Sequence, residues 1–206
     1  EYIKVSKNIR FEGDGYGDEW KKEAEKRGLS NVPKTPDALD FYVSDKALDM
    51  FSTTGVMNKV EVEARHEIML EEYQKRIQIE ARVLGDLAGN HIVPTAIRYQ
   101  NTLIDNVQRL KSILDSKTFD KVAKEQLEMI KEISTRISEI ISNKEAMIDA
   151  RRKANKLSSA KAMAHAYCDD ILPYFDKIRY HVDKLEIMVD DEIWPLPKLR
   201  ELLFTK

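Results

Sequence analysis

The sequence predicts an all-α fold: a mainly antiparallel bundle of long helices, with short accessory helices and a small irregular or extended N-terminal segment. Two observations carry this prediction. All seven glycines lie at or before Gly89. Glycine is the commonest residue at turns and helix C-caps. The chain after Gly89 should therefore form long helices joined by only a few turns, and these turns should be polar. Apolar residues also recur at steps of three and four from about Asn58 onwards, which is the period of an amphipathic helix.

Residues 1–55 are predicted to form a turn-rich loop and short accessory helices. The first 17 residues are the least helical and could contain extended pieces. Asp18 is a suitable N-cap for a short helix that Gly28 closes. The segment Thr35-Pro36-Asp37 fits an N-cap with proline at the first helical position, which predicts a second helix start. Ser44 predicts a third.

Residues 56–193 are predicted to be the long-helix bundle. One amphipathic helix should run from about Asn58 to His91, and Pro94 should kink or break it. A continuation should end near Asp115-Ser116.

The remaining long helices follow from the same periodicity. The next one, N-capped by Thr118 or Ser116, carries a heptad-like stripe from Phe119 to Ile140. The last starts at Ser158-Ser159 and contains Pro173, which should kink it. Four such helices joined by short turns predict a bundle.

Residues 194–206 are predicted to be a C-terminal docking tail, because they are unusually apolar for a chain end. Free ends fray unless they are docked. The tail should therefore pack either against a partner or back onto its own bundle, and both alternatives are open at this point. All three segments are expected to form one compact domain. The candidate assembly or docking residues are Trp194, Leu196, Leu199, Leu202, Leu203 and Phe204.

Composition excludes several classes of protein. Thirty-four Lys and Arg balance 36 Asp and Glu, a net charge of -2, which disfavours a nucleic-acid or membrane-surface partner. No apolar run approaches the ~20 residues of a membrane-spanning helix. A single cysteine suits a reducing compartment, so a cytoplasmic location is expected. The first residue is Glu1 rather than Met, which suggests a fragment of a longer protein.

Two motifs resemble ligand sites without completing one. Gly13, Gly15 and Gly17 precede a helix, where backbone N–H groups can bind phosphate, but four neighbouring carboxylates would repel an anion. A structural turn is the better interpretation. Glu63 and His66 have the Glu-x-x-His spacing of di-iron bundles, but the second such motif that a di-iron site requires is missing. His66 is therefore interpreted as a surface or interhelical residue.

Two further features are interpreted as structural. Cys168 precedes two aspartates, which disfavour a thiolate, so a small apolar core residue is expected. The basic run Arg151-Arg152-Lys153 could meet an acidic partner, but a solvated helix end is the usual explanation. No catalytic, cofactor-binding or metal-binding residue is assigned in this chain.

Several segments, in order from about residue 9 to 206, resemble the region that follows the catalytic domain in type III glutamine synthetases. The segments are Phe11-Glu12-Gly13-Asp14-Gly15-Tyr16, Asp18-Glu19-Trp20, Ala24-Glu25-Lys26-Arg27-Gly28-Leu29, Thr35-Pro36-Asp37-Ala38-Leu39, Glu61-Val62-Glu63-Ala64-Arg65-His66-Glu67, Glu72-Tyr73 with Lys75, Ile79-Glu80, Pro94, Tyr99-Gln100, Trp194-Pro195-Leu196-Pro197-Lys198 and Leu202-Leu203-Phe204.

This resemblance implies a parent enzyme that forms glutamine from glutamate, ammonia and ATP with Mg or Mn, and that assembles as a homo-oligomer of stacked rings. The catalytic residues of that family lie upstream, so none is carried over and no cofactor is expected in this fragment. The chain is then a non-catalytic, structural or assembly domain whose partners are its own upstream catalytic domain and sister subunits. The alternative is a stand-alone helical interaction module that uses the stripe from Phe119 to Ile140 as a coiled-coil seam.

Overall fold

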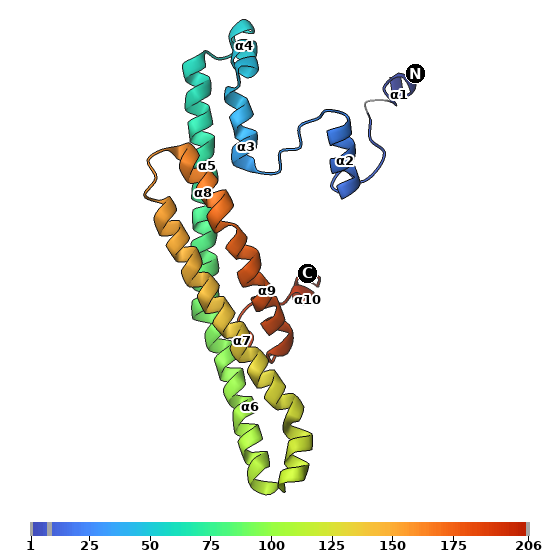
Figure 1. Cartoon of the computed structure of the whole chain (residues 1–206), viewed down its shortest axis with the longest axis vertical. Coiled ribbons are helices and arrows are strands. Elements are labelled where there is room, and N and C mark those ends of the chain that lie inside the picture. The colour runs from blue at the N-terminus through green and yellow to red at the C-terminus, as the bar shows by residue number, and fades with distance from the viewer. Residues whose placement is uncertain (1, 8–9, 205–206) are drawn as a thin grey trace.

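A computed structural model describes residues 2–7 and 10–204, and within these ranges all regular structure is helical. The all-α prediction is thereby confirmed. The extended pieces considered for the first residues are not found in the described part. Tyr2–Val5 forms a single helical turn, α1, and residues 10–17 are irregular. Three long helical rods dominate the molecule (Figure 1).

The first rod comprises α5 (Lys59–Asp86), the π-helical segment η3 (Leu87–Ile92) and α6 (Val93–Ile113). Asn58 caps its start, and Asn58 and Glu61 bond to each other's backbone N–H groups. Of the kink or break predicted at Pro94, the break is wrong, because the helix continues through this residue. A proline lacks an N–H and its ring clashes with a carbonyl one turn earlier. The wider π turn just before Pro94 accommodates both defects.

The second rod is α7 (Ser116–Ala154), which runs antiparallel to the first after a tight turn at Leu114-Asp115. The predicted cap at Thr118 or Ser116 is wrong. The Asp115 carboxylate is the cap and accepts a hydrogen bond from the Thr118 N–H at 3.1 Å. A carboxylate is the stronger acceptor at a helix N-terminus because it is charged.

The third rod comprises α8 (Ala160–Ala166), the π-helical segment η4 (Tyr167–Ile171) and α9 (Pro173–Met188). Ser159 caps it as predicted, accepting from the Ala162 N–H at 3.1 Å. A π turn again precedes the internal proline, and the Leu172 N–H donates to the carbonyl of Tyr167 at 3.0 Å. Pro173 therefore follows a π segment in the same way as Pro94.

Four long helices were expected, but the first two are joined into one rod, so the structure has three rods. The core lies where α7 packs against the first and third rods. The stripe considered as a coiled-coil seam faces this core, since Ile133, Ile137 and Ile140 are buried in it. Other core residues come from all three rods: Ile77, Ala81, Ile92, Ala96, Met147, Tyr167, Ile171, Ile178 and Leu185.

The N-terminal third divides into two parts (Figure 1). Helix α3 (Thr35–Asp40), the 3-10 turn η2 (Phe41–Val43) and α4 (Asp45–Thr53) lie against the start of α5. Residues 2–7 and 10–33, here called the N-terminal arm, contain α2 (Asp18–Lys26) and extend away from the rods.

The short helices test the remaining cap predictions. Gly17, not Asp18, is the N-cap of α2, and Asp18 is its first helical residue. There its charge still favours the helix N-terminus. Gly28 ends this helix with a φ of +71°, as its position predicted. Ser44 caps α4 as predicted. The start predicted at Thr35-Pro36-Asp37 is wrong by one residue: Lys34 is the N-cap of α3, Thr35 is its first helical residue and Pro36 its second.

Candidate functional site

Two residues near the start of the predicted docking tail, Trp194 and Leu196, pack against the bundle of their own chain. Trp194 is only 9% exposed and belongs to the main core. Leu196 is half-buried and packs against the same core. The indole Nε1 of Trp194 is buried without a hydrogen-bond partner in the described structure, so its attachment is apolar.

Lys198 fastens the tail next to this apolar contact. Its side chain is buried, and its Nζ donates to the Glu186 carbonyl at 2.7 Å and contacts the Asp191 carboxylate. Arg200 also pairs with Asp191. Hydrogen bonds from Lys198, and after it from Arg200, hold the pKa of Asp191 below its usual value. Two cations on one carboxylate thus fix the chain at the N-terminus of α10 (Leu199–Leu202).

The end of the tail is exposed. Leu203 and Phe204 are 75% and 81% exposed, and Leu202 is also an exposed residue. The Leu199 side chain lies outside the described structure. The six candidate residues are therefore not one surface. Trp194 and Leu196 form a base, whereas Leu202, Leu203 and Phe204 form an exposed apolar tip.

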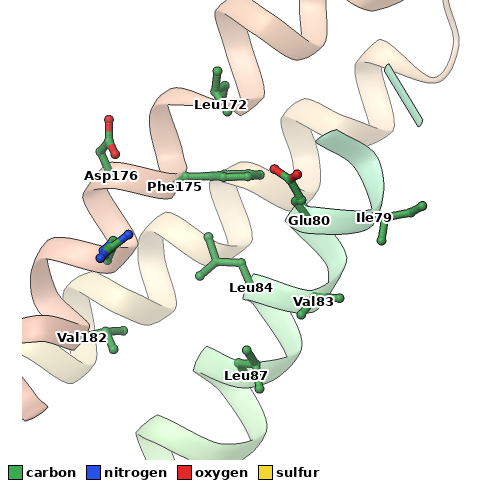
Figure 2. Close-up of a pocket in the computed structure, with 10 residues that line it drawn as sticks. Ile79, Glu80, Val83, Leu84, Leu87, Leu172, Phe175, Asp176 and Val182 are labelled. Carbon is green, nitrogen blue, oxygen red and sulfur yellow. The ribbon is translucent and has the colours of Figure 1, made fainter. Parts of the chain in front are cut away.

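A second apolar surface, which the sequence analysis missed, is a groove of 640 Å³ between α5 and α9. In Figure 2 Phe175 extends from α9 towards Glu80 on α5, and Leu84 and Val182 lie below them. Ile79 and Val83 are apolar residues of α5 that lie outside its periodic apolar stripe. These two residues are the feature of the sequence from which the groove could have been predicted. The groove is lined by Ile79, Glu80, Val83, Leu84, Leu87, Leu172, Phe175, Asp176, Arg179 and Val182.

A cluster of charged and titratable side chains joins α3 to the rods. Asp40 of α3 forms an ion pair with Lys161 of α8, with 2.7 Å between Oδ2 and Nζ. The other oxygen of this carboxylate, Oδ1, lies 3.2 Å from Nε2 of His66 on α5. His165 of α8 lies between the two aspartates of α3. Its Nε2 is 3.8 Å from Asp40 and its Nδ1 is 3.5 Å from Asp37.

The electrostatics of Asp40 reflect two opposing effects. Burial raises the pKa of its carboxyl group, but the hydrogen bond and charge of Lys161, followed by the two imidazoles, outweigh it and leave the pKa below its ordinary value. Three atoms of the cluster are nevertheless buried without a good hydrogen bond: Asp40 Oδ1, His66 Nε2 and His165 Nε2. His66 is therefore an interhelical residue, one of the two placements predicted for it.

The other candidates have structural surroundings. Glu63 pairs with Lys59 at 3.7 Å rather than sharing a site with His66, and no group of three or more possible metal-ligating side chains occurs in the described part of the chain. Cys168 is buried, as expected. Arg152 pairs with Asp149 in the last turn of α7, where the helix dipole favours cations.

The glycines before α2 form a turn. The Asp14 side chain accepts a hydrogen bond from the Tyr16 N–H at 2.9 Å, and the Asp14 carbonyl accepts one from Gly17. Two of the backbone N–H groups in this loop are thus used within the turn itself.

His181 makes the stability of the bundle dependent on pH. Burial, and after it the Arg136 guanidinium, lowers the pKa of His181, whose Nδ1 accepts from Arg136 at 3.2 Å. The unfolded chain then binds a proton more readily than the folded one, so stability falls as pH decreases through the ordinary histidine value of about 6.5. We expect the difference in unfolding free energy between wild type and His181→Gln to shrink from about pH 7.5 to 5.5. Urea unfolding at both pH values measures it, and a constant difference would contradict a depressed pKa.

None of the described helices is long and apolar enough to cross a membrane. Long helical rods with an apolar groove and an exposed apolar tip define an all-helical domain that exposes apolar surface. The chain belongs to the glutamine synthetase C-terminal domain family, whose pattern it matches over residues 1–111.

Individual relatives confirm the resemblance drawn from the sequence. A glutamine synthetase of Bacteroides fragilis (strain YCH46) is 47% identical over 206 residues, which cover 100% of this chain and 28% of that protein. A type-3 glutamine synthetase of Dictyostelium discoideum is 31% identical over 198 residues, 96% of this chain and 27% of that protein. A glutamine synthetase of Butyrivibrio fibrisolvens is 30% identical over 205 residues, 100% of this chain and 29% of that protein. The chain thus spans less than a third of the relatives it matches.

Proposed function

We propose that this chain is the structural and assembly domain of a type III glutamine synthetase. The parent enzyme would join ammonia to glutamate with ATP and Mg or Mn in the cytoplasm, using catalytic residues outside this chain. The partners of the domain would be its own catalytic domain and sister subunits in a homo-oligomer. Family membership and the relatives' names support the reaction, and the surfaces of the domain support the assembly role.

The observation that carries the assembly role is the amount of exposed surface. The chain exposes 14734 Å², whereas a compact monomer of the same mass should expose about 9,900 Å². The difference of roughly 4,800 Å² is several times the ~800 Å² per partner that a standard interface covers. Much of it follows from the extended rods and the separate arm (Figure 1). Such a shape suits a domain that other parts of an assembly cover.

The test replaces the exposed apolar tip with polar residues in the full-length enzyme. Leu202→Ser, Leu203→Ser and Phe204→Ser together should lower the oligomer mass measured by light scattering and leave the helical circular dichroism unchanged. Apolar interface anchors often cost ~2 kcal/mol or more when removed, which is roughly a thirtyfold loss of affinity. Ile187→Ser is the matched control, because Ile187 is an apolar residue of α9 that is 80% exposed. An unchanged oligomer with full ligase activity would show that the tip has no assembly role.

A further inference from the structure

The groove between α5 and α9 has the chemistry of a receptor for apolar side chains. Apart from Glu80, Asp176 and Arg179, every residue that lines it is apolar. Leu84 and Phe175 line it from the two helices (Figure 2). Its volume of 640 Å³ is within the range of about 300–1,000 Å³ that ligand pockets occupy, so it can hold more than one large side chain. Open apolar surfaces of this kind mark sites of interaction.

The exposed apolar tip has matching chemistry. Leu203 and Phe204 are large apolar side chains with most of their surface in contact with water. The chain before them is fixed, because Lys198 and Arg200 both pair with Asp191. A segment that is held in advance loses less conformational entropy on binding than a free chain end loses. The tip is therefore suited to insertion into an apolar groove.

The charges of the two surfaces are complementary. Carboxylates outnumber cations in the groove, and the guanidinium of Arg179 lies 3.6 Å from the Asp183 carboxylate. Within the described part of the chain, neither Glu80 nor Asp176 forms an ion pair with a cation. The tail, residues 194–206, contains three basic residues and one acidic residue. Opposite charges of this kind favour the encounter of two surfaces and set their orientation.

The tip does not occupy the groove of its own chain. No tip residue is among those that line the groove, and Leu203 and Phe204 remain exposed beside the bundle. An identical neighbouring chain offers both the apolar side chains and the charge that the groove fits. Because tip and groove are different surfaces, each copy supplies one of each, and the contact is repeated around a symmetric assembly.

We propose that the exposed apolar tip of one copy inserts into the groove between α5 and α9 of a second copy. This contact rests on the assembly role proposed above and names the surface that receives the tip. Leu203 and Phe204 supply the apolar anchors, and Glu80 and Asp176 face the basic tail.

Val83→Asp in the full-length enzyme tests the groove side. Val83 lies at the groove and is about half exposed, so the folded chain tolerates a charge there. Insertion of the tip would bury the new carboxylate among apolar side chains and beside two existing carboxylates, which is unfavourable. Association, followed by light scattering over a range of protein concentrations, should weaken roughly tenfold or more. Val60→Asp is the matched control at an exposed valine of α5 outside the groove and should associate like the wild type.

Cysteine cross-linking tests which chain supplies the tip. Val83→Cys together with Phe204→Cys, in one full-length polypeptide oxidised with copper–phenanthroline, should give covalent species of two or more chains on a non-reducing gel. Val60→Cys with Phe204→Cys should give several-fold less, and the single variants report the background from other cysteines. A cross-link confined to one chain would mean that the tip fills its own groove. That result, or a yield equal to that of the Val60 control, would overturn the proposal.

The serine variant of the tip separates this contact from the assembly role itself. If that variant lowers the oligomer mass but Val83→Asp leaves it unchanged, the tip docks on a different surface. The contact with the groove is then wrong, and the assembly role stands. If neither variant changes the oligomer, both proposals are wrong.

Discussion

Replacing Ile140 with alanine should lower the free energy of unfolding by about 3 kcal/mol. Ile140 is completely buried in the main core, on the face of α7 that packs between the other two rods. Truncating this side chain loses the free energy of burying its apolar atoms. It also leaves a cavity that the packed neighbouring rods close only in part. Urea unfolding followed by far-ultraviolet circular dichroism measures the change.

The neighbouring residue supplies the matched control. Ile141→Ala removes the same atoms from a side chain that is 43% exposed. We expect this variant to lose less than about 1 kcal/mol, because most of its surface is already in contact with water. Equal losses for the two variants would mean that α7 presents a different face to the core.

Replacing Trp194 with alanine should cost about 3 kcal/mol and release the C-terminal tail from the bundle. The indole is 9% exposed and also lies beside Lys198, whose Nζ is 5.8 Å from the ring centre. Loss of the ring would remove both the apolar contact and the surroundings that keep Lys198 buried. Urea unfolding and the hydrogen exchange of residues 189–204 measure the two effects.

Trp194→Phe separates packing from hydrogen bonding at this position. The indole Nε1 has no hydrogen-bond partner in the described structure, so phenylalanine removes a buried donor that gains nothing there. We expect this variant to lose roughly half as much stability as Trp194→Ala, through its smaller ring alone. If Trp194→Ala has the same stability and the same hydrogen exchange as the wild type, then packing on the bundle does not hold the tail in place.

Local signals in the sequence determined the helices and most of their ends. The periodicity of apolar residues and the absence of glycine after Gly89 predicted the rods. Ser44, Ser159 and Gly28 act as the predicted caps because capping depends on a residue and its near neighbours. The family resemblance likewise came from short segments in order along the chain, and it is confirmed.

Tertiary structure decided the features that join residues far apart in the chain. Pro94 and Pro173 are compatible with continuous rods because a π turn precedes each one, and packing of the flanking helix faces keeps both rods intact. The division of the tail into a buried base and an exposed tip depends on where the surface of the bundle ends. The charged cluster beside α3 brings Asp40 together with His66 and His165, and these residues lie on three different helices. Periodicity reports which face of a helix is apolar, but only packing determines which faces and charges meet.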